Sequence, residues 1–216
     1  MKLKRLPFLA GIVFCTGDAF AVWYGGDPNL NHGLAIDFDA YTYDDFDVTA
    51  NVETVDYLMA NVFSDATISA ATWQIRQDIN NGDGGTLVAS GTNYVTQTPN
   101  GFDAYGYTGY KLEMSGLNVN LAHGQYFIGW NVGDLDGFPR CFVATTSGIN
   151  SEGSPIGDGN SWFNSPMFFG VDFEPAGDVL DIGPCDFSYG VNNGVPEPVT
   201  LVAIGLGLAI FARRPK

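Results

Sequence analysis

Alternating apolar and polar residues recur through the middle of this chain, and they constrain its fold more than any other feature. Successive side chains of a strand point to opposite faces, so this alternation predicts strands with one buried and one solvent-facing side. The alternating segments are 34–40, 71–76, 110–114, 117–121, 126–132 and 169–173. Turn sequences rich in Gly, Asn and Asp separate them, at 80–85, 99–101, 123–124, 133–134 and 157–160. This spacing predicts an all-β fold, a single β-sandwich domain.

One segment fits either a strand or a helix. Its apolar residues Val52, Val55, Met59 and Val62 are spaced as on one face of a helix. The segment is nevertheless rich in β-branched residues and lies between predicted strands, so we expect a strand.

The first 21 residues have the composition of a secretory signal peptide. Lys2, Lys4 and Arg5 form a basic start, and a mostly apolar stretch follows over 6–15. Ala19 and Ala21 then occupy the small-residue positions of a signal peptidase site. We therefore expect cleavage after Ala21.

The segment 195–216 joins three physically different parts. The first is a proline motif made of Val195, Pro196, Glu197 and Pro198, which its prolines keep extended. The second is an apolar run over 199–212, predicted to enter a bilayer as a short transmembrane helix. The third is the basic end, Arg213, Arg214 and Lys216, which stays on the cytoplasmic side. An apolar helix of this length rises about 21 Å, short of a hydrocarbon core of about 30 Å, which indicates a weak anchor.

This ordered arrangement resembles the PEP-CTERM sorting tail of bacterial exported proteins, which exosortase-type enzymes recognise and process. The resemblance implies an exported protein, anchored transiently in the inner membrane and destined for the cell envelope or extracellular space. It also implies a link with extracellular polysaccharide and biofilm. The body more loosely resembles the all-β ectodomains that precede such tails, in Asp44-Asp45-Phe46 and in the segments 87–91 and 124–130. That second resemblance implies a jelly-roll-like sandwich without a defined chemistry.

These features divide the chain into four parts: a signal peptide over 1–21, an ectodomain over 22–185, a linker over 186–194 and the sorting tail over 195–216. Of the nine Lys and Arg residues, three lie in the signal peptide and three in the tail. Removing Asp18 and Glu197 from the 24 acidic residues leaves 22 against three basic ones, a formal net charge of −19 between them. Such a charge repels phosphate groups and excludes nucleic acid as a partner.

The sequence contains few of the residue patterns that are typical of enzyme active sites. The chain has two histidines, His32 and His123, which lie beside Gly and are expected in exposed turns. It contains no Gly-x-Ser-x-Gly elbow and no His-Glu-x-x-His zinc motif. We expect a protein that is not an enzyme. An exported hydrolase stays open as an alternative, because a Ser-His-Asp site assembles in space rather than in sequence.

Acidic clusters make calcium the one cofactor to consider. Asp37 and Asp39 alternate, and Asp44, Asp45 and Asp47 follow closely. Calcium requires six to eight oxygen ligands, which carboxylates and loop carbonyls supply. Solvated acidic loops explain the same residues, so the expectation is no cofactor, with calcium as the alternative.

Trp162 is the candidate glycan contact, because it lies in a Gly-, Ser- and Asn-rich segment where an exposed ring is available to stack on a sugar. Cys141 and Cys185 are the cysteines left after removal of the signal peptide, and an oxidising compartment permits a disulfide between them. Two separate thiols remain the alternative.

The expected function is that of a non-enzymatic surface or extracellular-matrix protein, with an exosortase-type enzyme and extracellular polysaccharide as partners. A secreted carbohydrate-binding module is the second reading, and an exported hydrolase is the third.

Overall fold

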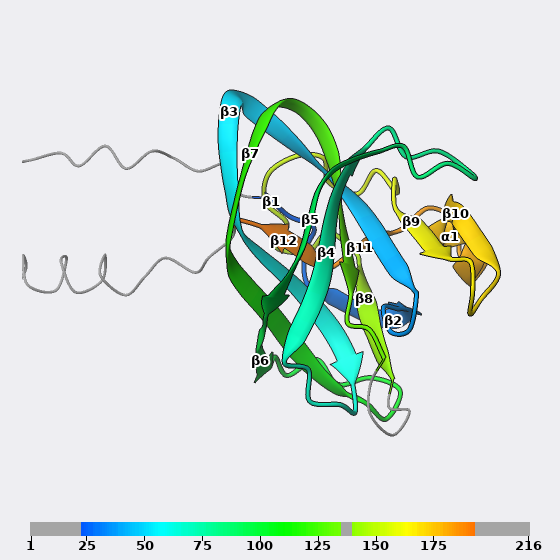
Figure 1. Ribbon diagram of the computed structural model, residues 1–216. Helices are drawn as coiled ribbons and strands as arrows, with labels where there is room; N and C mark the ends of the chain where they lie inside the picture. Colours follow the sequence, from blue (N-terminus) through cyan, green and yellow to red (C-terminus); the bar gives the residue numbers. More distant parts are fainter. Residues whose placement is uncertain (1–22, 135–139, 193–216) are drawn as a thin grey trace, which may run out of the picture.

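The chain folds into an all-β domain built on one antiparallel sheet of 12 strands, as the computed structural model shows for residues 23–134 and 140–192 (Figure 1). The expected all-β class is confirmed. The strands are β1 (Trp23–Tyr24), β2 (Pro28–Ala35), β3 (Tyr41–Ser64), β4 (Ala70–Gln77), β5 (Thr86–Tyr94), β6 (Thr96–Pro99), β7 (Thr108–Asn131), β8 (Cys141–Thr146), β9 (Trp162–Ser165), β10 (Val171–Pro175), β11 (Asp186–Phe187) and β12 (Tyr189–Val191). One short helix, α1 (Ala176–Leu180), follows β10.

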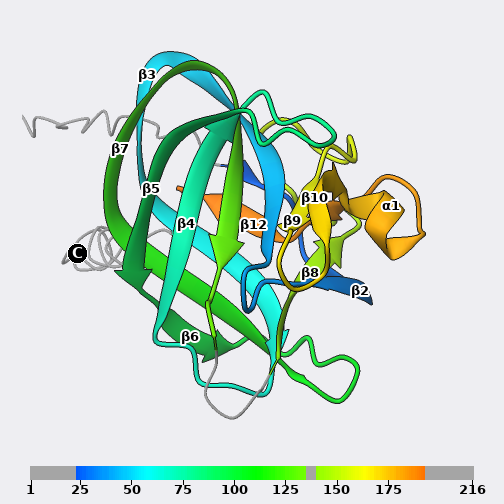
Figure 2. The ribbon, with the colours of Figure 1, turned by 45° about the vertical axis from the view of Figure 1, so that its right-hand side comes forward.

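Two strands of 24 residues each, β3 and β7, form the longest ladder. They pair antiparallel from Thr42↔Trp130 to Ser64↔Thr108. The register shifts between Val48 and Val52 and again between Val55 and Tyr57. Bulges of this kind bend a strand and increase its twist. Figure 2 shows the result, since β3 and β7 arch over together at the edge of the domain.

The long ladder changes two expectations about strands. The segments 110–114, 117–121 and 126–132 were expected as separate strands, yet all three lie along or at the end of β7. The turn expected at His123 and Gly124 is wrong, because Gly124 pairs with Val48 inside the ladder. The strand expected over 52–62 is confirmed as part of β3.

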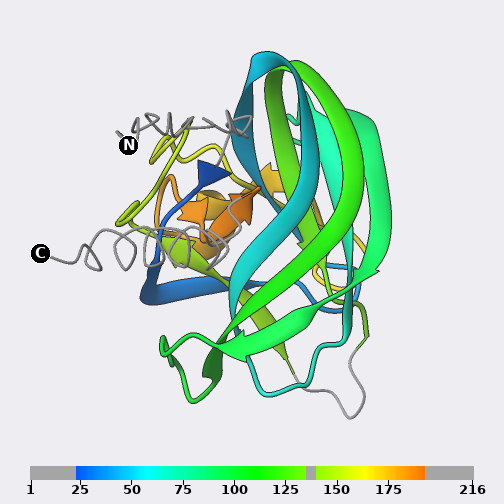
Figure 3. The same ribbon diagram turned by 90° about the vertical axis from the view of Figure 1, so that its left-hand side faces the viewer.

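The remaining strands attach along both halves of this bent ladder. Residues 41–43 of β3 pair with β9, whereas residues 58–64 pair with β12 and β8. On β7, residues 127–131 pair with β4, which in turn pairs with β5, and residues 110–113 pair with β6. Figure 3 shows how this arrangement wraps the sheet around its interior.

Large aromatic side chains fill that interior. Trp130, Tyr189, Phe163 and Phe187 are among the largest fully buried residues of this core. The rings of Trp130 and Tyr189 stack with centroids 6.3 Å apart. The Tyr189 hydroxyl hydrogen-bonds with the Thr42 hydroxyl, so its polar end is satisfied inside the core.

The linker expected over 186–194 is wrong for residues 186–191. These residues form β11 and β12, which pair with β8 and β3, and all of the residues in these two strands are buried. Phe187 and Tyr189 are part of the main hydrophobic core. The folded domain therefore extends beyond the boundary expected at residue 185 and includes Val191.

Of the two alternatives left open for Cys141 and Cys185, the structure has the separate thiols, since both residues are free. Strand pairing explains why. Asp186 pairs with Thr146 at the end of β8, whereas Cys141 begins that strand. Five residues of strand span about 17 Å, and a disulfide requires Cα atoms within about 7 Å of each other.

The predicted signal peptide, sorting motif and transmembrane helix lie outside the described residues. Among residues 23–134 and 140–192, no helix has the length and apolar character needed to cross a bilayer.

Candidate functional site

An aromatic cleft of about 410 Å³ opens between β2, β8 and the loop that precedes β7. Its lining consists of Asn31, His32, Gly33, Phe63, Tyr105, Tyr107, Phe142 and Leu180. Phe63 is buried and forms the floor, whereas Tyr105 is 62% exposed at the rim. Clefts that combine apolar surface with a few polar groups are the usual form of ligand sites.

A tight turn positions the two tyrosines. Ala104 and Tyr107 exchange backbone hydrogen bonds of 3.2 and 2.9 Å. The two residues between them, Tyr105 and Gly106, have φ values of 56° and 84°. Positive φ at both central positions is the geometry of a type I′ turn, which places Tyr105 at its tip.

Side-chain contacts hold this turn against the sheet. The Asp103 carboxylate accepts a 2.8 Å hydrogen bond from the Gly109 amide, and the Tyr105 hydroxyl donates to the Asn31 carbonyl. The Tyr105 ring meets Phe63 edge-on at 6.2 Å. The Tyr107 ring meets Phe142 in the same way at 5.5 Å. The walls of the cleft are therefore formed before any ligand arrives.

Hydrogen-bonding groups at the rim are few. They come from Asn31 and His32, which lie on β2. The Thr145 hydroxyl holds this strand in place, because it donates to the Asn29 side chain at 2.9 Å and to the His32 carbonyl at 3.1 Å. Flat apolar walls with polar groups at the edge suit a ligand that has both apolar faces and hydroxyl groups.

Trp162 occupies a different environment from the one expected. It begins strand β9 rather than lying in an exposed loop, and it is half-buried. Its indole N–H donates to the Asn160 side chain at 3.2 Å. The ring packs against a small cluster of buried side chains: Tyr43, Ile79, Phe127 and Phe173. An exposed stacking platform at Trp162 is therefore not what the structure shows.

The two histidines lie on different strands, His32 on β2 and His123 on β7. His32 borders the aromatic cleft, whereas His123 is exposed. The expectation that both lie in turns is wrong.

The acidic residues considered for calcium have separate structural roles. Asp37 forms an ion pair of 2.8 Å with Arg140 and accepts the Cys141 amide at 3.0 Å. Asp39 caps the loop between β9 and β10, and Asp47 accepts the Ser154 hydroxyl at 2.8 Å. Across the described parts of the chain, no three His, Cys, Asp or Glu side chains are placed to hold a metal ion.

Buried carboxylates form the strongest electrostatic feature. Asp44 and Asp45 on β3 are both 1% exposed. Burial raises the pKa of Asp44 well above its usual range, and repulsion from Asp186 adds to the effect. Burial also raises the pKa of Asp45 to about 7, with further contributions from Asp158 and Asp186. The Asp45 carboxylate accepts hydrogen bonds from Gln125 at 2.6 Å and from Asn160 at 2.8 Å.

The sequence did not predict the aromatic cleft, and it pointed to Asp44 and Asp45 as an acidic cluster without predicting their burial or the approach of Asp186. The cleft residues are far apart in sequence, from Asn31 to Leu180, so no local pattern unites them. The available signal was the segment 100–107, where Asn-Gly-Phe-Asp-Ala-Tyr-Gly-Tyr combines turn residues with aromatic ones.

The raised pKa of Asp45 predicts a stability that depends on pH. A folded-state pKa of about 7, above the ordinary value of 3.8, means that the protonated form stabilises the fold. That contribution is complete below about pH 4 and is lost as the pH rises through about 7. Asp45→Asn should therefore raise the free energy of unfolding at pH 8 by about 2–4 kcal/mol and flatten its fall between pH 4 and pH 8.

Chemical denaturation across this pH range, in the presence of a chelator, measures the effect. Asp47→Asn on the same strand is the matched control, since it also removes one carboxylate. An unchanged pH profile in Asp45→Asn would contradict the assignment.

Comparison with solved structures found a distant likeness. A solved structure containing the cysteine protease and lectin-like domains of Cwp84, a surface layer associated protein of Clostridium difficile, aligns with 70% of this chain at 16% sequence identity and a TM-score of 0.42. The alignment covers 31% of that chain, so this protein corresponds to less than a third of its length. No protein-family model and no curated protein matches the sequence.

Proposed function

We propose that this chain is an exported, non-enzymatic surface or extracellular-matrix protein whose body is a jelly-roll-like β-sandwich. The segment 1–21 directs export, and the segment 195–216 acts as the sorting tail for an exosortase-type enzyme. The observation that supports this proposal most is the position of the two ends of the folded domain. Trp23 in β1 pairs with Val191 in β12, so both flanking segments leave the domain at the same place.

The N-terminal end suits cleavage after Ala21. Trp23 is buried, and its indole N–H donates to the Pro155 carbonyl at 2.9 Å. Cleavage at that point leaves Val22 as the first residue and removes none of the described strands.

The C-terminal end suits a tethering segment. Asn192 follows β12, and its side chain accepts the Asp56 amide at 2.9 Å and donates to the Thr54 carbonyl at 2.8 Å. These bonds fix the chain one residue past the last strand. A force applied to the tail would therefore act on β3, to which Asn192 is hydrogen-bonded, and would not fray the end of the domain.

Replacing Pro196, Glu197 and Pro198 by alanine tests the sorting role. Export should continue, with Val22 as the first residue of the mature chain, but removal of the tail should stop. The variant should then accumulate in the inner membrane, as cell fractionation and mass spectrometry of the intact chain would show. Alanine replacement of Asn193 and Gly194 provides a control outside both the motif and the described strands. Unchanged processing of the motif variant, or a surface protein that begins at Met1, would contradict the proposal.

A second candidate function, carbohydrate binding, is favoured by the aromatic cleft. Sugar rings have apolar faces that stack on aromatic side chains and hydroxyl groups that need polar partners at the rim. Tyr105, Tyr107 and Phe142 supply the rings, and Asn31 and His32 supply the polar groups. The strongly acidic body favours a neutral sugar over an anionic one.

Tyr105→Ala tests this second function. Loss of the exposed ring should weaken the binding of a neutral oligosaccharide by about tenfold, in line with about 1.4 kcal/mol for one stacking contact. The melting temperature should fall only modestly, because Tyr105 is 62% exposed and the variant loses one hydrogen bond to Asn31 and one ring contact with Phe63. Tyr94→Ala is the matched control, since Tyr94 is 89% exposed on β5. Equal effects of the two substitutions would remove the cleft as the binding site.

A further inference from the structure

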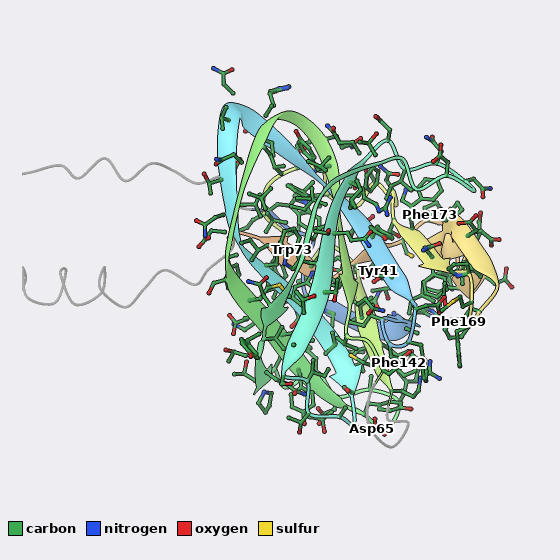
Figure 4. The ribbon with its side chains drawn as sticks, in the orientation of Figure 1. Tyr41, Asp65, Trp73, Phe142, Phe169 and Phe173 are labelled. Atoms are coloured by element: carbon green, nitrogen blue, oxygen red, sulfur yellow. The ribbon has the colours of Figure 1, made fainter. Side chains whose placement is uncertain are left out.

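A second group of exposed apolar side chains lies at the tip of the β9–β10 hairpin. Met167, Phe168 and Phe169 are 85%, 53% and 43% exposed. Figure 4 shows Phe169 of this tip on the same side of the molecule as Phe142 of the cleft. Contiguous exposed apolar surface on a soluble domain usually marks an interaction site.

Arg140 and Phe38 connect the hairpin tip to the cleft. The Arg140 guanidinium carbon lies 4.9 Å from the centre of the Phe142 ring and 5.7 Å from that of Phe38. Phe38 in turn stacks on Phe168, with ring centroids 4.4 Å apart and planes 9° from parallel. These side chains thus form one aromatic track, which runs from the cleft lined by Tyr105 and Phe142, along Arg140 and Phe38, to Phe168.

Hydrogen bonds hold two parts of the track in place, the hairpin tip and the backbone of Arg140. The Asp39 carboxylate accepts the Ser165 hydroxyl at 2.6 Å and the amides of Met167 and Phe168 at 2.7 and 3.2 Å. Arg140 donates its backbone amide to Asp65 at 2.8 Å. A surface that is ordered in advance loses less conformational entropy when a ligand binds.

The charges along the track are already paired. The Arg140 guanidinium forms its ion pair with the buried Asp37 carboxylate. Asp39 accepts three hydrogen bonds and supports the backbone of the hairpin tip. The track therefore offers aromatic faces without an unpaired cation to attract an acidic polymer, and the field of the acidic body repels one.

We propose that the aromatic track binds a linear, neutral polysaccharide along several sugar units, with the cleft as one subsite and the exposed Phe168 ring, supported by Phe38, as another. This inference rests on the carbohydrate-binding function proposed for the cleft and extends it from one sugar to a polymer. Affinity then increases with chain length, because a longer chain reaches both subsites at once.

The test measures binding of cello-oligosaccharides and malto-oligosaccharides of increasing length to the full-length protein in a mild non-ionic detergent. An anionic series that contains uronic acids is measured beside them. The unmodified protein should bind one neutral series with affinity that rises with length. Phe168→Ala should weaken the long oligosaccharides about tenfold and leave the short ones unchanged.

Two further variants separate ring stacking from other effects. Phe168→Leu keeps an apolar side chain without a flat face and should lose the same length dependence. Ile149→Ala, at a residue 63% exposed outside the track, should retain it.

Binding of short oligosaccharides that Tyr105→Ala abolishes, without any gain from chain length, would overturn the extended track and leave the cleft proposal standing. A length dependence that survives in Phe168→Ala would overturn it as well. Preference for the anionic series, or no binding of either neutral series, would overturn both.

Discussion

The antiparallel ladder between β3 and β7 supports every other part of the structure. Its two bulges bend a pair of 24-residue strands so that one half carries β9 and β4 and the other half carries β12, β8 and β6. The core forms inside this bend, where Trp130 of β7 stacks on Tyr189 of β12. Because β4, β6, β8, β9 and β12 all pair with β3 or β7, opening this ladder would disrupt the core, the cleft and the paired chain ends at the same time.

The same ladder also determines where function can be located. The paired ends, β1 and β12, attach beside residues 58–60 of β3, which places the two flanking segments at one site. The hairpin of β9 and β10 attaches to residues 41–43 at the other end of that strand. In Figure 1 this hairpin lies on the right, away from β1 and β12. The exposed aromatic residues of the hairpin tip thus lie away from the end of the domain where the described chain begins and ends.

Alternation predicted the all-β class and most strand positions, but it did not predict their continuity. A bulge adds one residue and shifts the alternating pattern, so a single bent strand reads as several short ones. The aromatic residues Phe187 and Tyr189 were the available sign that 186–191 is strand, although Gly and Asn nearby favoured a linker. The cleft could not be predicted, because Asn31, Phe63, Tyr105 and Phe142 meet only through the pairing of distant strands. Trp162 was predicted to be an exposed glycan contact because its neighbours in sequence are polar. Its position on β9 instead packs its ring against a buried cluster.

The central claim, that the β3–β7 ladder is the stable centre of the domain, is tested most directly by amide hydrogen exchange. Amides in hydrogen-bonded core strands exchange only when the whole domain unfolds, whereas peripheral elements open locally. The backbone amides of residues 42–46 and 126–130 should exchange most slowly, with a free energy of opening close to the global free energy of unfolding. The short strand β10, which pairs with β9 alone within the described residues, should exchange faster. Equal or faster exchange in β3 and β7 than in β10 would contradict the account.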